Sequence, residues 1–466
     1  SVSWISGIPD PLSALFYVPS FLWYVNYREN GERKYLAASL VAYGLAALCK
    51  ETPLALPLVL CVWELTHSKV KQSLANRLKD LFRLMIPYAL VGAGYLALRF
   101  SVLGRISWKH PFMAHTPDSA IWMTVPFVFL NYVKHLVAPF YLSLIYGTSF
   151  VTSSSDPKFL MPSVLLLGLA IMLWIYRRKV TAQVWVAISL IIAPLLPVLN
   201  LKVFHYEYII QDRYLYLPSI GFCYLIAILS LKLWRRQAQL GIAITVIILI
   251  AFGASTILQN RIWHDSAALW QRAIYYAPTS WSAHYNLGLA YLNLKQDQAA
   301  RDELVEALRL NQREANIFNN LALAKARLGD RAGAITNLKE ALLLDPKLLE
   351  AHNNLGAFLY EEGLLVDAQH EFSVVLAVDP SSISARFNMA RTLAAMGNHE
   401  AAIREFQSVL QKDPNDVPAH YELAMSYAAV GQQQEALGEF NHAVQLDRDP
   451  NRPTYMKQKL EQSTPK

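Results

Sequence analysis

A cluster of ionisable side chains stands directly before an apolar segment that begins YLYLPSIGF. The cluster comprises Lys202, His205, Glu207, Asp212 and Arg213. Charges near the depth of a membrane are costly, so by default they mark a functional site. Interfacial anchoring is the alternative, because lysine, arginine and tyrosine hold many helices at the membrane surface without doing chemistry. Asp212 and Arg213 abut the apolar segment and favour the functional interpretation most.

A second pair of charges, Lys50 and Glu51, interrupts a long apolar stretch over 35–66. The stretch is too long for one membrane-spanning helix, and Pro53 follows the two charges. We therefore predict two short helices that meet at a polar tip. A self-neutralising ion pair at the end of a helix is the other interpretation of Lys50 and Glu51.

The composition divides the chain into two parts. Of its 466 residues, 54% are apolar and 17% are charged, whereas soluble proteins average about 25% charged residues. Residues 1–280 contain 24 Lys/Arg and 11 Asp/Glu, and residues 281–466 contain 18 and 24. This asymmetry excludes a single globular domain, a disordered chain and a nucleic-acid-binding tail. The three cysteines lie within apolar stretches, which excludes a disulfide framework, and no Cys/His spacing indicates a metal site.

Six apolar segments in the first part are long enough to cross a bilayer, which takes roughly 20 residues. They are residues 12–27, 84–101, 159–176, 180–201, 214–233 and 240–259. A further segment, 119–140, carries Asn131, Lys134 and His135 among its apolar residues, which is typical of a helix that lies in the membrane surface. We predict an all-α, polytopic helix bundle in contact with the lipid bilayer.

Basic clusters predict the orientation of this bundle. They occupy residues 67–83, 177–179 and 232–236. Lysine and arginine mark the cytoplasmic side of a membrane, and the three clusters share a side only if 119–140 does not cross. Residues 50–52 and 202–213, and everything after residue 259, then face the extracytoplasmic side.

The second part repeats itself every 34 residues. The series are Pro346, Pro380 and Pro414; Leu287, Leu321, Leu355, Met389 and Leu423; Ala300, Ala334, Ala368, Ala402 and Ala436; and Gly329, Gly363, Gly397 and Gly431. A unit of this length with a small residue where two helices cross, a turn glycine and a final proline is the tetratricopeptide pattern. It predicts an α-solenoid of five units, 281–314, 315–348, 349–382, 383–416 and 417–450, after one partial leading helix.

One polar position keeps the same period. It holds Asn286, Asn320, Asn354 and Asn388, and Glu422 closes the series. Equivalent residues of stacked units line up along a solenoid, whose concave surface binds other molecules. Because each amide offers a donor and an acceptor, we predict a row that binds the backbone of an extended peptide. The alternative is that asparagine is simply frequent at this position.

The domain organisation follows from these two parts. We predict a membrane domain over 1–264, a repeat domain over 265–450 and a flexible polar tail over 451–466. The chain begins with Ser and shows no basic segment, apolar run and cleavage site in succession, so we expect its natural N-terminus to be missing rather than a signal peptide to be present.

Four ordered motifs carry a resemblance to one family. They are SVSWISGIPDPLSALF at the start, CKETPLALPLVL at 49–60, IAPLLPVLNL with QDRYLYLPSIGFC within 192–223, and NRIWHDSAALWQRAIYYAPTSWSAHYNLG at 260–288. Together they resemble the transmembrane and tetratricopeptide-repeat O-mannosyltransferases and their bacterial relatives, which have a GT-C membrane fold. The resemblance covers nearly the whole chain.

The resemblance implies a glycosyltransferase. Its expected reaction moves a sugar, mannose in the characterised relatives, from a polyprenyl- or dolichyl-phosphate carrier to a Ser/Thr hydroxyl of a protein held by the repeats. The expected location is a bacterial inner membrane or an endoplasmic reticulum membrane, with the repeats on the outer or lumenal side. A need for a divalent cation is left open.

Roles for individual residues follow from the same resemblance. Arg213 is expected to stabilise the negative charge on the departing phosphate, and Lys50 and Lys202 to bind that phosphate. Asp212 occupies the acid position before the arginine, where related sequences more often have glutamate.

Two further acids complete the implied catalytic set. Asp10 corresponds to the acid of the WISG loop, although Ile8 and Pro9 replace a basic pair that relatives often carry there. Glu51 matches the acid of the KE pair at the outward tip. The general base that a hydroxyl acceptor needs lies in the first outward loop of GT-C enzymes, which places it before residue 1. A non-catalytic scaffold for envelope or lumenal complexes is the competing hypothesis.

Overall fold

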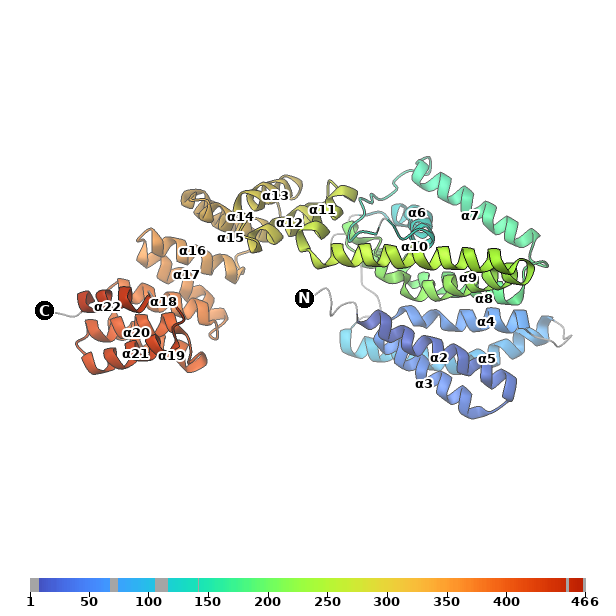
Figure 1. The fold of residues 1–466 in the computed structure, drawn as a ribbon, viewed down its shortest axis with the longest axis horizontal. Helices are drawn as coiled ribbons and strands as arrows, with labels where there is room; N and C mark the ends of the chain where they lie inside the picture. The colour runs from blue at the N-terminus through green and yellow to red at the C-terminus, as the bar shows by residue number, and fades with distance from the viewer. Residues whose placement is uncertain (1–7, 68–73, 105–115, 141, 450–451, 464–466) are drawn as a thin grey trace. The chain divides into compact units, whose positions relative to one another are not determined.

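The computed structural model describes residues 8–67, 74–104, 116–140, 142–449 and 452–463. Over these ranges the chain is helical and contains no strand (Figure 1). It divides into two compact units, residues 1–280 and 281–466. Lys69 and Lys71 of the predicted basic cluster, and the first seven residues of the N-terminal motif, lie outside the described residues.

The first unit starts with two helical hairpins, α2–α3 and α4–α5, and continues with six further α-helices in its described part. Its α-helices are α2 (Pro9–Asn30), α3 (Arg33–Cys49), α4 (Leu56–His67), α5 (Leu74–Leu103), α6 (Asp118–Val137), α7 (Pro157–Ile175), α8 (Ala182–Ile192), α9 (Tyr216–Arg236), α10 (Ala238–His264) and α11 (Ser266–Tyr276). Its 3-10 helices are η1 (Thr52–Ala55), η3 (Ala193–Leu195), η4 (Pro197–Leu199), η5 (Leu201–Val203), η6 (Tyr206–Tyr208) and η7 (Asp212–Leu215). The predicted pair of short helices meeting at Lys50 and Glu51 is confirmed.

Six helices of the described part are long and apolar enough to cross a membrane. They are Ala75–Leu103, Asp118–Val137, Pro157–Ile175, Ala182–Leu199, Asp212–Arg236 and Ala238–His264. Their outer faces are apolar: Leu90 of α5, Leu167 of α7 and Leu249 of α10 are each more than 60% exposed. Such a surface suits lipid and is unfavourable in water. The first unit is therefore a membrane unit, and this name is kept below for residues 1–280.

Two segments need separate description, one outside these six helices and one among them. Residues 12–27 fall within α2, which is absent from the six and whose buried face is largely polar, with Asp10, Ser13 and Tyr17 among its residues. Asp118–Val137 (α6) qualifies by length and composition, yet Figure 1 shows it nearly end-on while α9 and α10 run along the picture. Helix α6 is thus set crosswise to the bundle, an orientation that fits the prediction of a helix lying in the membrane surface.

The segments that connect the long helices fall into two groups, one at each end of the membrane unit. In Figure 1, α4, α7 and α9 end at one end of the membrane unit, where α5, α8 and α10 begin. The basic segments 177–179 and 232–236 therefore share that end. The tip at 50–52 and the segment 202–213 share the opposite end, which is the grouping that the basic clusters predicted.

The irregular segment 193–215 positions most of the ionisable residues. Helix α8 gives way to 3-10 turns where Pro194 and Pro197 remove backbone donors. Leu201 and Ile209 of this segment are buried in one core with residues of α6. Helix α9 then packs closely on α8 at Gly221, where an added Cβ would lie 2.6 Å from the carbonyl oxygen of Ala187.

The core of the first two hairpins is unusually polar. Ser20 of α2 bonds to Ser39 of α3, whose hydroxyl is 2.6 Å from that of Tyr88 in α5. Tyr24 donates to the carboxylate of Glu64 at 2.7 Å. These buried hydroxyl groups fix the rotation of each helix about its axis, because a turned helix would leave them unpaired.

The repeat unit consists of five helical hairpins and a final helix. Its helices are α12 (Trp281–Asn293), α13 (Asp297–Leu310), α14 (Ala315–Arg327), α15 (Arg331–Leu344), α16 (Leu349–Glu361), α17 (Leu365–Val378), α18 (Ile383–Ala395), α19 (His399–Lys412), α20 (Val417–Ala429), α21 (Gln433–Leu446) and α22 (Arg452–Ser463). The four predicted turn glycines have φ between 76° and 88°. Lys295 adopts the same left-handed conformation (φ 58°) 34 residues before Gly329, so the first unit makes this turn without glycine.

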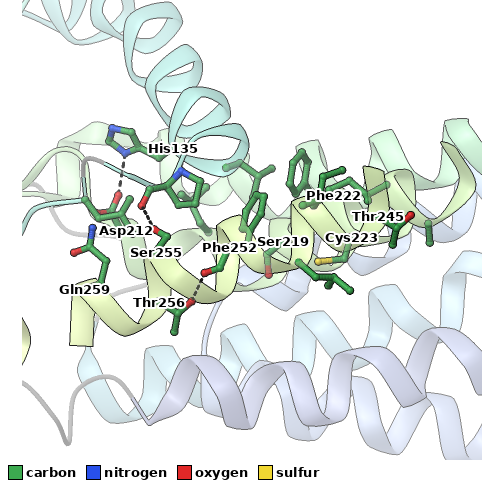
Figure 2. Close-up of a pocket in the computed structure, with 18 of the residues that line it drawn as sticks. His135, Asp212, Ser219, Phe222, Cys223, Thr245, Phe252, Ser255, Thr256 and Gln259 are labelled. Carbon is green, nitrogen blue, oxygen red and sulfur yellow. Dashed lines mark hydrogen bonds and ion pairs between the residues drawn. The ribbon is translucent and has the colours of Figure 1, made fainter. Parts of the chain in front are cut away.

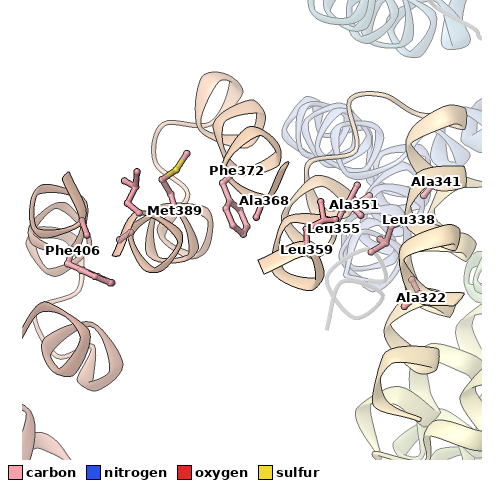
Figure 3. Close-up of a cluster of buried hydrophobic side chains, with 14 of the residues drawn as sticks. Ala322, Leu338, Ala341, Ala351, Leu355, Leu359, Ala368, Phe372, Met389 and Phe406 are labelled. Atoms are coloured by element: carbon pink, nitrogen blue, oxygen red, sulfur yellow. The ribbon is translucent and has the colours of Figure 1, made fainter. Parts of the chain in front are cut away.

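The core of the repeat unit alternates alanine with larger side chains (Figure 3). Ala351, Leu355 and Leu359 of α16 and Ala368 and Phe372 of α17 are all buried. Small residues let the two helices of a hairpin approach, and the larger ones fill the space between neighbouring hairpins.

Two boundaries differ from the predicted ones. Helix α11, assigned to the repeat domain from the sequence, falls in the first unit. Its Arg272 donates to the carbonyl oxygen of Phe140, and the carbonyl oxygen of Tyr276 accepts from Gly147. Where a flexible tail was expected over 451–466, the structure has helix α22, which buries Met456 against α20 and α21.

Candidate functional site

The polar tip between α3 and η1 forms the first part of the candidate site. Helix α3 ends at Cys49, and Lys50 continues with an extended backbone (φ −162°, ψ 156°) before Pro53 in η1. The Lys50 ammonium forms an ion pair with Asp10, the second residue of α2. Both side chains are largely buried, with 13% and 8% of their surfaces exposed. The ion pair therefore ties the start of α2 to the tip.

Tyr214 connects this ion pair to the segment before α9. The Lys50 ammonium lies 4.5 Å from the centroid of the Tyr214 ring, and the Arg213 guanidinium lies 5.2 Å from the same centroid. Arg213 is exposed and makes a long hydrogen bond of 3.5 Å to the Tyr214 hydroxyl. Two cations therefore share one aromatic ring, one of them buried and the other open to a ligand.

Glu51 and Arg99 border the same surface. The Arg99 guanidinium, near the end of α5, is 3.5 Å from the Glu51 carboxylate and donates to the Tyr95 hydroxyl at 3.0 Å. Its Nε is buried and has no hydrogen-bond partner among the residues that the structure describes. We call Asp10, Lys50, Glu51, Arg99 and Arg213 the tip cluster. Its three cations and two carboxylates leave a net positive charge, which suits a phosphate group.

The surroundings of Lys50 oppose its charge. Burial lowers the pKa of the Lys50 ammonium below its usual 10.5, the Asp10 carboxylate raises it, and the nearby Arg213 lowers it. An anion bound between Lys50 and Arg213 would offset their mutual repulsion. The tip cluster is therefore electrostatically prepared for an added negative group.

Asp212 points away from the tip cluster, although it directly precedes Arg213. Its Oδ1 lies 2.9 Å from Nδ1 of His135 on α6, and its Oδ2 accepts from the Tyr146 hydroxyl at 2.5 Å. Burial and the Asp212 carboxylate raise the pKa of Tyr146, so this hydroxyl keeps its proton. The backbone N–H of Ser143 donates to the Tyr146 oxygen at 2.8 Å. The short helix η7 thus presents a cation to one neighbourhood and a carboxylate to another.

A long groove begins at this carboxylate. It has a volume of about 640 Å³ and runs between α9 and α10, with α6 at one end. Figure 2 shows His135, Asp212 and Gln259 gathered at that end, and Phe222, Cys223 and Thr245 along its length. The hydroxyls of Thr245 and Thr256 donate to backbone carbonyls of their own helix. The wall of the groove is therefore mostly apolar, with its ionisable groups at one end.

The other residues of the 202–213 segment lie apart from the tip cluster. Lys202 forms an ion pair with Asp118 at 2.8 Å, and no contact in the described part of the chain joins it to Lys50 or Arg213. His205 accepts from the backbone N–H of Glu207 at 3.3 Å. Glu207 is buried and lines a small polar cavity of about 110 Å³. The remaining residues of that cavity are Ile145, Tyr146, Gly147, Thr148, Ser149, Ala277, Thr279 and Ser280.

The asparagine row of the repeat unit is partly occupied by bonds between repeats. The Asn320 amide donates to the Tyr285 hydroxyl at 3.1 Å, and Asn354 donates to Asn319 Oδ1 at 3.0 Å. Asn388 makes the corresponding contact one repeat later, at 3.4 Å. Asn286, in the first repeat, donates to its own helix. Each amide is half-buried, so these residues both connect repeats and border the surface.

Three residues of the site were missed in the sequence. Arg99 lies within a predicted span, and the sequence pattern marks His135 only as a polar residue of a surface helix and does not mark Tyr146. An isolated charge near the end of an apolar helix is a signal that would have identified Arg99. Among the described residues, no group of three or more His, Cys, Asp or Glu side chains is placed to hold a metal ion.

The fold and the repeats define the class: a polytopic membrane protein with a tetratricopeptide-repeat domain. Tetratricopeptide-repeat families match residues 258–315, 319–382 and 393–460. Among solved structures, the chain is similar to YrrB, a tetratricopeptide-repeat protein with an unusual peptide-binding site (19% identity, TM-score 0.35), over 41% of this chain and 99% of that one. It is also similar to MamA (19% identity, TM-score 0.32), over 34% of this chain and 94% of that one.

The curated relatives to which the chain is similar are protein O-mannosyl-transferases. The chain is 31% identical to human protein O-mannosyl-transferase TMTC1 over 31% of this chain and 17% of that protein. It is 25% identical to human protein O-mannosyl-transferase TMTC4 over 62% of this chain and 44% of that protein. The resemblance to the transmembrane and tetratricopeptide-repeat O-mannosyltransferases is thereby confirmed, at modest identity. The chain spans less than half the length of either relative.

Proposed function

We propose that the protein transfers mannose from a polyprenyl- or dolichyl-phosphate carrier to a Ser/Thr hydroxyl of a protein substrate. The names of the relatives support a mannosyltransferase, and the apolar helices support a donor that resides in the membrane. The donor, the acceptor and the side of the membrane are parts of this proposal.

The tip cluster is the observation that carries the proposal. Departure of the lipid phosphate from the anomeric carbon builds negative charge on its oxygens, and a fixed guanidinium beside them lowers the barrier. Arg213 is exposed next to the buried Lys50–Asp10 pair, so it is available to the phosphate without first breaking an ion pair in the described part of the chain. Lys50, Glu51 and Arg99 would then keep the side chains around Tyr214 in position.

Two predicted residues take different roles in this proposal. Asp212 does not face the tip cluster, because His135 and Tyr146 engage both of its oxygens. Lys202 is half-buried and paired with Asp118. We therefore assign phosphate binding to Arg213 and Lys50 first, and retain Lys202 only as a residue that attracts the donor to the surface.

The acceptor protein is proposed to bind the repeat unit on the extracytoplasmic side. The grouping of 50–52 with 202–213 at the end opposite the basic segments supports that side for the catalytic site. The row of half-buried amides at Asn286, Asn320, Asn354 and Asn388 supports an extended peptide as ligand. Protease treatment of sealed vesicles tests this orientation: the repeat unit is expected to be cleaved only where the extracytoplasmic face is outward.

Transfer measured with the full-length protein tests the proposed reaction. Purified protein in proteoliposomes is given radiolabelled polyprenyl-phosphate mannose and a Ser/Thr-rich peptide, and labelled peptide is counted. Arg213→Ala is expected to lower the transfer rate by about 10²–10³-fold, as does removal of a residue that stabilises developing negative charge. Arg235→Ala, an exposed arginine at the opposite end of the membrane unit, is the matched control and is expected to transfer normally.

The competing hypothesis predicts a different result. A tethered scaffold would transfer no label in any variant, yet would still bind a protein partner through its repeats. Wild-type transfer that Arg213→Ala leaves unchanged would keep the enzyme and remove the tip cluster as its site.

A further inference from the structure

A histidine of the third repeat contacts two hydrogen-bond acceptors at once. His352, near the start of α16, has its Nδ1 2.5 Å from Glu371 Oε2 on α17 and its Nε2 3.1 Å from the carbonyl oxygen of Pro346. A carboxylate and a carbonyl oxygen only accept hydrogen bonds, so both ring nitrogens must donate. The neutral ring has a single N–H, and only the protonated ring can make both bonds. The contact therefore favours a positively charged His352.

The fourth repeat makes the same contact with an arginine. Arg386 occupies the position 34 residues after His352 and donates to Glu405 Oε2 at 2.6 Å and to the carbonyl oxygen of Pro380 at 2.7 Å. Arginine has only donors and keeps its charge, so this position accommodates a cation that donates twice. We call the arrangement the double contact: a side chain that donates to the glutamate 19 residues later and to the carbonyl oxygen of the proline six residues earlier.

The fifth repeat has the double contact with histidine again. His420 Nδ1 lies 2.6 Å from Glu439 Oε2, and its Nε2 lies 3.0 Å from the carbonyl oxygen of Pro414. The His442 ring also stacks on His420 here, with the ring centroids 4.5 Å apart, and adds a second titratable group. The third repeat therefore offers the simpler comparison with Arg386.

Glu371 is the charged partner of His352. In the described part of the chain, His352 forms no ion pair with any other side chain. The arginines of the other helices packed on α16 pair elsewhere: Arg327 with Asp297, Arg331 with Glu361, Arg386 with Glu405, and Arg391 with Glu422. The remaining ionisable side chains of α14, α15 and α17 are Lys325, Lys339, Glu340, Asp367 and His370. Among the described residues, none of these five is bonded to His352.

We propose that His352 makes the third repeat sensitive to pH, because both bonds of its double contact are present only while the ring is protonated. Loss of the proton breaks the ion pair with Glu371 and leaves one of the two acceptors without a donor. The third repeat is then most stable below about pH 6 and loses stability as the pH rises toward about 8, the range in which histidine titrates. Pro346 ends the second repeat, so deprotonation also weakens the junction between the second and third repeats. This inference does not depend on the proposed transfer reaction.

Hydrogen exchange of the full-length protein in detergent micelles tests the proposal. Protection of α16 and α17 is measured at about pH 5.5 and about pH 8 and corrected for the intrinsic exchange rate at each pH. Protection in the wild type is expected to fall about tenfold between the two values, because a hydrogen bond to a charged group is lost. His352→Arg reproduces the contact of Arg386, so its protection is expected to be the same at both values.

Two further variants locate the effect. Arg386→His places a titratable ring in the fourth repeat, so α18 and α19 are expected to acquire a fall in protection of similar size. His370→Arg, which removes an exposed histidine from the same hairpin, is the matched control and is expected to keep the wild-type fall.

Three results would overturn the proposal. The first is wild-type protection of α16 and α17 that stays within twofold between the two pH values. The second is a fall that persists in His352→Arg or disappears in His370→Arg, since either would assign the response to another group. The third is an Arg386→His protein that is folded at about pH 5.5 and shows no new response in α18 and α19.

Discussion

The polar contacts of the membrane unit and those of the repeat unit are organised differently. In the membrane unit they join residues far apart in the chain: Tyr24 to Glu64, Lys50 to Asp10 and His135 to Asp212 are separated by 40, 40 and 77 positions. In the repeat unit the same two separations recur. A pair 19 residues apart joins the two helices of a hairpin, as in His352–Glu371, and an amide contact 35 residues apart joins successive repeats.

This difference shows that polar contacts are present in several equivalent copies in the repeat unit but not in the membrane unit. The 19-residue pair occurs in four of the five repeats, once with Arg386 in the place of histidine, so no single copy determines the fold. No such contact recurs at a fixed period in the described part of the membrane unit, although Tyr24 and Arg28 share Glu64. A substitution in the solenoid should therefore act locally, because each repeat contacts only its neighbours, whereas one in the membrane unit should alter the whole bundle.

The largest expected effect is in the repeat unit, and it tests whether a substitution there acts only locally. Phe372 is fully buried, and its ring packs so closely on Gly356 that an added Cβ there would lie 2.7 Å away. Phe372→Ala should destabilise the repeat unit by about 3–5 kcal/mol, from lost burial and the cavity left behind. Hydrogen exchange of the full chain should accelerate in α16–α19 and stay unchanged in the membrane unit.

Leu343→Ala is the matched control for this measurement. Leu343 lies on α15 and is 76% exposed, so its truncation is expected to leave exchange rates as they are. Accelerated exchange in α2–α5 of the Phe372→Ala protein would contradict the claim that damage in the solenoid remains local.

A smaller effect is expected at the buried ion pair of the membrane unit. Asp10→Ala leaves the Lys50 ammonium buried without its carboxylate partner, which typically costs about 3–5 kcal/mol. We expect the lower end, about 3 kcal/mol, because Lys50 can release its proton: burial already lowers its pKa. SDS-induced unfolding of the bundle in mixed micelles measures the change. Glu32→Ala, which breaks an exposed pair with Lys34, should leave the unfolding midpoint unchanged.

The pH dependence of this variant has a defined sign. A lysine whose folded-state pKa lies below its unfolded value of 10.5 binds fewer protons when folded. Stability then rises with pH between these two values. The defect of Asp10→Ala is expected to be full at a pH below the folded-state pKa of Lys50 and to shrink as the pH approaches 10.5. A defect that stays constant over this range would mean that the ammonium is not buried.

The same contrast explains what the sequence could and could not predict. The 34-residue period determined the hairpins and their turns, and only Lys295 replaced a turn glycine. Lys50 and Glu51 were located because charges and a proline interrupt an apolar run. His135 and Arg99 could not be assigned to the site from the sequence, because their partners depend on how α6 and α5 are oriented in the bundle. The helical spacing of apolar residues gives no information about that orientation. Helix α22 had a weak signal in the spacing of Met456 and Leu460, which are four residues apart and buried.

The smallest expected effect concerns the amide row, where the two interpretations of the asparagines can be separated. Asn354 donates to Asn319 across a repeat boundary, so Asn354→Ala should destabilise the repeat unit by about 1 kcal/mol, the net value of one such bond. If the row also binds peptide, a loss of similar size should appear in affinity for a Ser/Thr-rich peptide, about fivefold in Kd, measured by fluorescence anisotropy. Asn293→Ala, at the exposed end of α12, is the control and should change neither quantity. A stability loss without a change in Kd would mean that the asparagines only connect neighbouring repeats. Acceptor binding would then have to use another part of the repeat unit.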